Sequence, residues 1–114
     1  MCDYCQYLDL VETNRCRINF CKRCKAFTLT YQSCCAVFTQ LELEKFHIAL
    51  RVLTPSHYQH DFLGKRMAVI KKPEAPIGFC LSQDDTKELA SAVAESLTHY
   101  DAYCATRRAS RFLI

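Results

Sequence analysis

Two pairs of cysteines near the start of the chain place the strongest constraint on how it can fold. Cys2 and Cys5 form one C-x-x-C pair, and Cys21 and Cys24 form a second pair fifteen residues later. Each C-x-x-C turn supplies two thiolates from one tight loop. A hairpin of two strands of about six residues would return the second pair to the first. The C-x2-C-x15-C-x2-C spacing is typical of a tetrahedral zinc site, so we predict that these four cysteines bind one Zn2+ ion.

A closed set of four cysteine ligands would make this zinc structural. Four thiolates leave no open position for water or substrate, so the ion would take no part in catalysis. Its binding free energy would be folding free energy, because the unfolded chain offers no preformed site. Lys22, Arg23 and Lys25 surround the second pair. Their positive charges would favour the thiolate form that binds metal.

The number of cysteines also indicates the compartment. The chain has nine, and seven of them lie within the first 35 residues. An odd number argues against complete pairing in disulfides. No secretory signal is visible, so we predict a cytoplasmic protein in a reducing compartment, where clustered cysteines more often bind metal. The apolar runs are far shorter than the ~20 residues that cross a bilayer, which argues against a membrane protein.

Alternating apolar and polar residues predict strands in the first third of the chain. The four expected strands cover residues 6–12, 15–20, 26–31 and 34–38. In the first, Leu8 and Leu10 are expected on one face, opposite Val11. In the third, the side chains expected to share a face are those of Phe27, Leu29 and Tyr31.

The rest of the chain predicts two helices around two further strands. Thr39 and Glu42 form a capping-box pattern at a helix start, and that helix is expected to end before Pro55. Residues 55–66 look like a loop, 67–72 and 77–81 like strands, and a second helix is expected to begin near Ser82. The order ββββ-α-ββ-α predicts an α+β fold in one compact domain spanning 1–114, with a zinc-binding part at 1–38 and an α-β-β-α part at 39–114.

The first third of the chain resembles the zinc-ribbon superfamily through its four cysteines, the hairpin between the pairs and the strands that follow. The resemblance implies a structural metal site, commonly in modules that bind nucleic acid or belong to transcription and translation assemblies. Zinc-ribbon turns often have a glycine after the second cysteine and a proline inside the pair. Here those places are held by Gln6, Lys25, Asp3 and Lys22.

A rival interpretation uses Cys16. The spacing Cys16-x4-Cys21-x2-Cys24 is that of a plant-type iron–sulfur loop, which leaves an iron–sulfur or thiol redox protein as the alternative function. The residues between Cys16 and Cys21 are bulky and alternate like a strand, which favours the zinc interpretation. In that interpretation Cys16 lies up the strand from the site and binds no metal.

The remaining cysteines and histidines offer weaker signals. Cys34 and Cys35 are expected on opposite faces of a strand, where they cannot easily share one metal ion. Cys80 and Cys104 fall on apolar faces and are expected in the core. His57 and His60 could form a second metal site or an acid–base pair, but we favour surface histidines. An enzyme centred on Cys80 or on the two histidines is a third hypothesis.

The net charge of +3 is too small to indicate a nucleic-acid-binding protein by itself. Basic residues interleaved with aromatics form a candidate partner-binding set in the first third of the chain: Arg15, Arg17, Lys22, Arg23 and Lys25. The run 107–114 is basic and then apolar; it could dock a partner or an acidic surface, but we favour an end that stabilises the helix C-terminus through the helix dipole or that frays. No catalytic sequence motif is present. We therefore predict a non-enzymatic binding module, with a protein partner favoured over nucleic acid. The sequence leaves the oligomeric state open.

Overall fold

The chain folds as an α+β protein in which two helices cover one face of an antiparallel sheet. The computed structural model describes residues 6–62, 64–72 and 78–112. Within them the element order is ββββ-α-βββ-α, with a short 3-10 turn at Pro55–His57. The predicted fold class is confirmed, with one strand more than expected.

The first four strands form a meander in the order β1-β2-β3-β4. Their bounds are β1 Tyr7–Glu12, β2 Cys16–Cys21, β3 Ala26–Tyr31 and β4 Cys34–Phe38. The alternation predicted for β3 is confirmed, because Phe27, Leu29 and Tyr31 are all buried while the threonines between them are only half-buried. These side chains give the sheet an apolar face and a polar face.

An irregularity in β1 changes one predicted face. The register of β1 against β2 shifts between Asp9 and Val11, so Leu10 has no partner on β2. Such a bulge puts two consecutive residues on one side. Leu10 and Val11 are therefore both buried, and the expectation that Val11 faces away from Leu10 is wrong. The carbonyl of Leu10 instead accepts a hydrogen bond from Nδ1 of His99 at 2.8 Å.

The first helix begins where the sequence predicts. In α1, Gln40–Arg51, the amide of Glu42 donates to the Thr39 hydroxyl, and the Glu42 carboxylate accepts from the Thr39 amide. This reciprocal cap satisfies two backbone groups that the helix itself cannot bond, and such a cap is worth about 1 kcal/mol. The cap fixes the direction in which α1 leaves β4.

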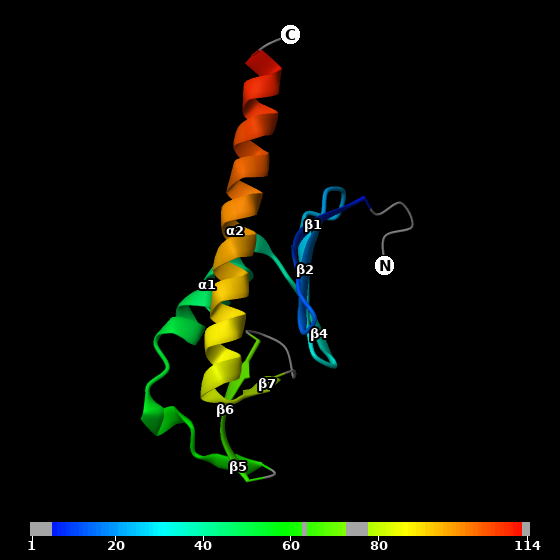
Figure 1. Cartoon of the computed structure of the whole chain (residues 1–114). Helices are drawn as coiled ribbons and strands as arrows, with labels where there is room; N and C mark the ends of the chain where they lie inside the picture. Colours follow the sequence, from blue (N-terminus) through cyan, green and yellow to red (C-terminus); the bar gives the residue numbers. More distant parts are fainter. Residues whose placement is uncertain (1–5, 63, 73–77, 113–114) are drawn as a thin grey trace.

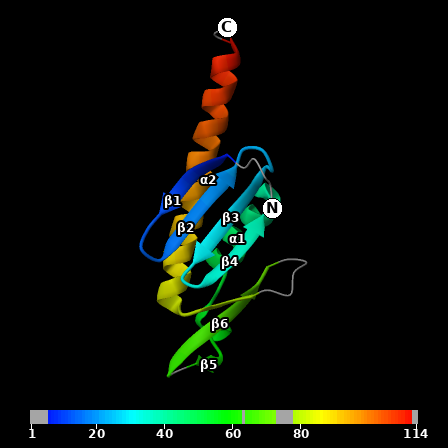
Figure 2. The same cartoon turned by 90° about the vertical axis from the view of Figure 1, so that its right-hand side faces the viewer.

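The core lies between the helices and the apolar face of the meander. α2, Gln83–Phe112, packs against β1 and β2, while α1 packs against β3 and β4 and against α2. Figure 2 shows the opposite face of the sheet uncovered by any helix. Fully buried side chains from both helices and the meander meet in one cluster, among them Phe20, Phe27, Phe38, Phe46, Leu89 and Val93.

A second, smaller sheet follows α1. Its strands are β5 His60–Phe62, β6 Lys65–Lys71 and β7 Gly78–Leu81, in the order β5-β6-β7. The expectation of a loop over 55–66 is therefore wrong, because β5 and the start of β6 occupy part of it. β5 is only three residues long, too short to show an alternating pattern.

The second helix is much longer than the body it covers. α2 contains 30 residues, which corresponds to about 45 Å. Its C-terminal part extends beyond the meander (Figure 1), and the molecule measures 58 Å along its longest axis. Among the residues that the structure describes, no helix is both long and apolar enough to cross a membrane.

Candidate functional site

The turn between β2 and β3 holds the second cysteine pair in a specific conformation. The amide of Cys24 donates to Sγ of Cys21 at 3.3 Å, and the amide of Lys25 donates to the Cys21 carbonyl at 2.8 Å. Cys21 is buried and Cys24 is exposed. An amide that donates to sulfur stabilises the thiolate, which is the form of cysteine that binds metal. The hydrogen bond therefore favours the thiolate of Cys21, while Cys24 is exposed in the same turn.

Lys25 adopts the backbone conformation that the glycine of a zinc-ribbon turn would supply. Its φ is +60°, in the left-handed region that side chains other than glycine rarely occupy. The conformation costs about 1 kcal/mol in a residue that has a Cβ atom. The lysine therefore holds this turn at some cost in stability.

The β1–β2 hairpin brings the start of the described chain beside this turn. Tyr7 is paired with Cys21, and the carbonyl of Gln6 accepts a hydrogen bond from the amide of Lys22 at 2.8 Å. The returning hairpin that the cysteine spacing predicts is thus present. The other predicted ligands, Cys2 and Cys5, lie outside the described residues. Within the described ranges, no three His, Cys, Asp or Glu side chains are grouped to hold a metal ion.

Cys16 lies at the opposite end of β2 from Cys21. It pairs with Tyr31, whereas Cys21 pairs with Ala26, and five steps of a strand separate the two cysteines by about 17 Å. Burial, with a smaller contribution from Glu88, raises the pKa of the Cys16 thiol to about 11. A neutral thiol at this distance cannot share one cluster with Cys21 and Cys24, so the iron–sulfur spacing has no counterpart in the folded chain.

Three of the predicted partner-binding residues line one pocket beside the cysteine turn. The pocket, of about 450 Å³, is lined by Gln6, Lys22, Arg23, Lys25, Tyr103 and Arg107. Nζ of Lys22 lies 5.5 Å from the ring centroid of Tyr103, and Cζ of Arg107 lies 5.7 Å from it. We call this site the basic pocket. Tyr103 and Arg107 reach the pocket from α2; sequence reasoning did not single out Tyr103, and it considered Arg107 only as part of the basic run 107–114, not together with the cysteine turn.

One protein-family profile matches almost the whole chain. A profile for a family of unknown function, DUF6686, matches residues 1–107, which include both cysteine pairs and every residue of the basic pocket. The chain belongs to DUF6686. No curated protein and no solved structure matches the chain.

The other two predicted partner-binding residues of this DUF6686 chain form ion pairs elsewhere. Arg15 donates to Asp85 at 2.7 Å and to Glu88 at 3.3 Å, both on α2. Arg17 pairs with Glu12 across the exposed face of the sheet at 2.5 Å. These two arginines therefore do not line the basic pocket, and Arg15 instead ties the β1–β2 turn to the first turns of α2.

Asp85 is the centre of a hydrogen-bonded cluster around Arg15. Its carboxylate accepts from the hydroxyl of Tyr31 at 3.0 Å and from the amide of Ser82 at 3.1 Å, which also makes Asp85 part of the cap of α2. Burial alone would raise the pKa of Asp85, but the hydrogen bonds from Ser82, Tyr31 and Arg15 outweigh it and lower the pKa. Burial, and then the bond to Asp85, raises the pKa of Tyr31 to about 12. The cluster thus stabilises an ionised carboxylate.

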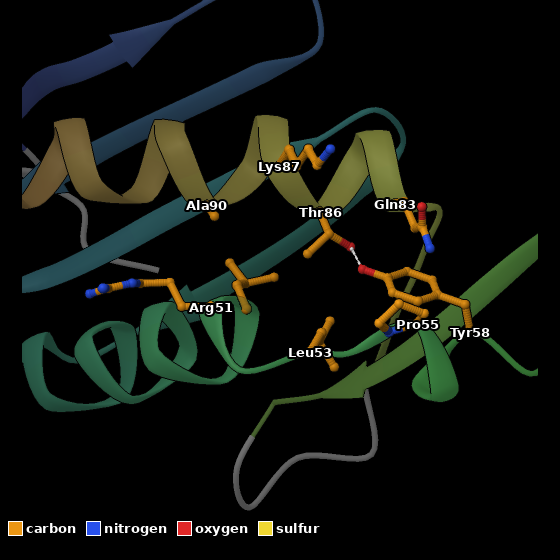
Figure 3. A pocket seen from close by; sticks show the side chains of 9 residues that line it. Arg51, Leu53, Pro55, Tyr58, Gln83, Thr86, Lys87 and Ala90 are labelled. Carbon is orange, nitrogen blue, oxygen red and sulfur yellow. Dashed lines mark hydrogen bonds between the residues drawn. The ribbon is translucent and has the colours of Figure 1, made fainter.

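A second pocket lies between the end of α1 and the start of α2. Figure 3 shows Tyr58 pointing toward α2, where its hydroxyl donates to Oγ1 of Thr86 at 2.9 Å. The pocket has a volume of about 420 Å³, and its lining contains the cations Arg51 and Lys87 but no carboxylate, cysteine or histidine. Thr86 in turn donates to the Ser82 carbonyl at 2.9 Å. The Tyr58 hydroxyl thus ties the segment after the 3-10 turn to the first turn of α2.

The remaining cysteines of the DUF6686 chain do not form a group. Cys34 and Cys35 are exposed on β4, and Sγ of Cys35 accepts from the Thr30 hydroxyl at 3.6 Å. Cys104 is half-buried on α2. Cys80 is exposed on β7, so the expectation that it lies in the core is wrong. Its neighbours Phe79 and Leu81 take the inward positions of that strand instead.

Of the two histidines that suggested a second site, the structure describes the side-chain contacts of His57 only. Nδ1 of His57 accepts a hydrogen bond from the amide of Thr54 at 2.9 Å, which closes the 3-10 turn. His60 is in β5, and its side chain lies outside the described residues. His57 therefore has a local structural role.

Proposed function

We propose that the protein is a small, non-enzymatic binding module stabilised by a structural zinc ion, which Cys2, Cys5, Cys21 and Cys24 would hold. The observation that carries the proposal is the conformation of the Cys21–Lys25 turn. It combines an amide-to-sulfur hydrogen bond with a left-handed residue directly after the second cysteine. A left-handed lysine costs stability, and a turn that must point two sulfur atoms at one ion is a reason for the cost.

The wider geometry fits this proposal. The β1–β2 hairpin brings Gln6, the residue that follows Cys5 in the sequence, into contact with the amide of Lys22. Positive charges from Lys22, Arg23 and Lys25 lie around the turn and would offset the negative charge of four thiolates on Zn2+. In a protein of 114 residues, a metal ion would add substantially to the stability that a modest core can supply.

The non-enzymatic part of the proposal rests on the chemistry of the described pockets. Catalysis by general acids and bases needs titratable groups within hydrogen-bond reach of one another. Among the described residues, the pocket of about 420 Å³ beside Tyr58 is lined by no carboxylate, cysteine or histidine, and the basic pocket is lined by cations, a tyrosine and a glutamine. An adjoining pocket of about 520 Å³ is lined by one carboxylate, that of Asp84, without a described cysteine or histidine beside it. We propose a cytoplasmic module that acts by contacting a macromolecular partner, as a subunit or accessory factor of an assembly.

Elemental analysis of the purified full chain tests the zinc site. We expect one zinc per chain, a colourless protein, and loss of the metal together with the folded state in Cys21→Ser. Cys16→Ala is the matched control and should keep its full zinc content. A brown protein that contains iron, or a Cys21→Ser variant with a full complement of zinc and unchanged melting, would contradict the proposal.

A further inference from the structure

We propose that the basic pocket binds the phosphate backbone of nucleic acid. This inference rests on the proposed function, because it names the partner class that the binding module would contact. It assigns the contact to Lys22, Arg23, Lys25 and Arg107, and it excludes Arg15 and Arg17.

Four cations converge on the pocket from two distant parts of the chain. Three come from the turn between β2 and β3, and Arg107 comes from the last part of α2. None of the described residues that line the pocket is acidic. Within the part of the chain that the structure describes, no ion pair links Lys22, Lys25 or Arg107 to a carboxylate. Like charges repel, so gathering them in one concave site is favourable only when anions offset the repulsion, and the proposed zinc site, two positive charges with four thiolates, would offset only part of the charge of four cations.

Tyr103 fixes the positions of two of these cations. Lys22 and Arg107 both lie within 6 Å of its ring centroid, and Nη1 of Arg107 donates to its hydroxyl at 3.5 Å. The ring itself packs against Phe20 in the core, with the ring centroids 6.4 Å apart. Cation–π contacts hold the long side chains near one place without neutralising their charge. The pocket is therefore partly organised for an anionic ligand.

The composition of the pocket favours nucleic acid over an acidic protein surface. Protein–protein interfaces are depleted in lysine and have an apolar centre. Of the six described lining residues, two are lysines, two are arginines, and one, Tyr103, is aromatic. Lysine and arginine at a polar, exposed site are the groups that contact phosphates, where they release condensed counterions.

The position of the pocket gives a phosphate backbone room to continue. Arg107 and the next residue, Arg108, are both exposed on α2, and the C-terminal part of that helix extends beyond the meander (Figure 1). A phosphate backbone that leaves the pocket therefore has a further exposed cation, Arg108, next to Arg107 in the sequence.

Fluorescence anisotropy with labelled oligo(U) RNA and with a labelled DNA duplex tests the proposal on the full, zinc-loaded chain. We expect binding at about 50 mM salt and about 50-fold weaker binding at about 200 mM, as four phosphate contacts to a single strand imply. The double variant Lys25→Gln/Arg107→Gln should bind at least about tenfold more weakly at the lower salt concentration. It should also lower the salt slope by about 1.4.

The matched control is the double variant Arg17→Gln/Lys45→Gln. It removes the same charge from exposed positions on β2 and α1 that lie outside the pocket, and it should leave both affinity and slope nearly unchanged. Equal weakening in the two double variants would overturn the proposal. So would failure of wild type to bind either probe at about 50 mM salt. Arg107→Gln alone serves if the double variant fails to fold, because Arg107 is exposed on α2.

A labelled polyglutamate peptide separates the two partner classes. Pocket-dependent binding of polyglutamate without binding of RNA or duplex DNA would establish an acidic protein partner and overturn the proposal. Zinc content, measured on the same samples, distinguishes this failure from failure of the proposed function. Protein that binds RNA through the pocket without zinc would refute the zinc site alone, and protein that holds zinc but ignores all nucleic acid would refute the pocket alone.

Discussion

The two ends of the meander use similar cations in opposite ways. At the β1–β2 turn, Arg15 lies against Asp85 and Glu88 near the start of α2. At the β2–β3 turn, Lys22 and Lys25 lie with Arg107 near the end of the same helix. At the first end the arginine is paired with carboxylates of the same molecule, whereas at the second end several cations lie together in one pocket. The comparison teaches that charge pairing, and not the count of basic residues, separates a structural surface from a candidate binding surface.

The largest expected effect is at the β2–β3 turn, which holds Cys21 and Cys24. Cys21→Ser should abolish zinc binding and the cooperative melting transition, because structural zinc contributes about 10–16 kcal/mol of binding free energy in small domains. Cys16→Ala removes a buried thiol at the other end of the same strand and should cost about 1–2 kcal/mol with zinc retained. Calorimetry and elemental analysis of both variants check the contrast. Equal zinc loss in the two variants would show that the ends of β2 do not differ in this way.

The next largest effect is at the β1–β2 turn, where Arg15 contacts Asp85. Asp85→Ala should lower the free energy of unfolding by about 2–3 kcal/mol, because it removes a helix cap and a charged acceptor used by Tyr31 and Arg15. Urea denaturation measures the loss. Asp84→Asn, in the same turn of α2, should cost at most about 0.5 kcal/mol. Neither change should reduce zinc content or RNA binding, and a loss of either would couple the two ends.

Low pH should reduce the stability that Asp85 contributes through its contacts with Arg15 and Tyr31. The pKa of Asp85 is lowered in the folded protein, so its contribution to stability is present above its ordinary value of about 4 and is lost as pH falls through the lower folded value. Denaturation of wild type and Asp85→Asn across this range, compared at each pH, isolates the contribution. The difference between them should shrink as the pH falls. A difference that stays constant would contradict the assignment.

The smallest effect separates stability from binding. Lys25→Gly should stabilise the protein by about 0.5–1 kcal/mol because it relieves a positive φ, and it should weaken RNA binding because it removes a cation of the basic pocket. Gln32→Gly is the matched control. Gln32 also has a positive φ, but its amide donates to the Arg15 carbonyl at the other end of the meander.

The control should gain stability and leave binding unchanged. Thermal melts and anisotropy titrations on the two glycine variants provide both measurements. If Lys25→Gly weakens neither binding nor its salt dependence, Lys25 has no place in the phosphate site.

Local patterns predicted the parts of the fold that are determined locally. The alternation in β3 gave its buried face, and the Thr39–Glu42 pattern gave the start of α1, because both depend on residues a few positions apart. The bulge at Leu10 was missed, since it depends on how β1 pairs with β2. β5 was missed because three residues carry too little pattern.

The candidate sites show the same difference between features that depend on local sequence and features that depend on long-range contacts. Spacing alone predicted the hairpin that brings Gln6 and Tyr7 to the cysteine turn. The pairing of Arg15 with Asp85 joins residues 70 positions apart, and the pocket joins Lys22 to Arg107. No local pattern reports such contacts, so the sequence grouped five cations that the folded chain separates into pairs and a pocket.

Charged residues are distributed unevenly along α2. Its first thirteen residues, 83–95, contain four acids and one base, whereas 96–112 contain one acid and three arginines. Arg15 offsets two of these acids, so the excess positive charge at the far end of a helix about 45 Å long would do most to orient the protein in the field of an approaching polyanion. Encounters would then begin with the projecting end of α2 leading, and their rate, more than the lifetime of the complex, would respond to ionic strength.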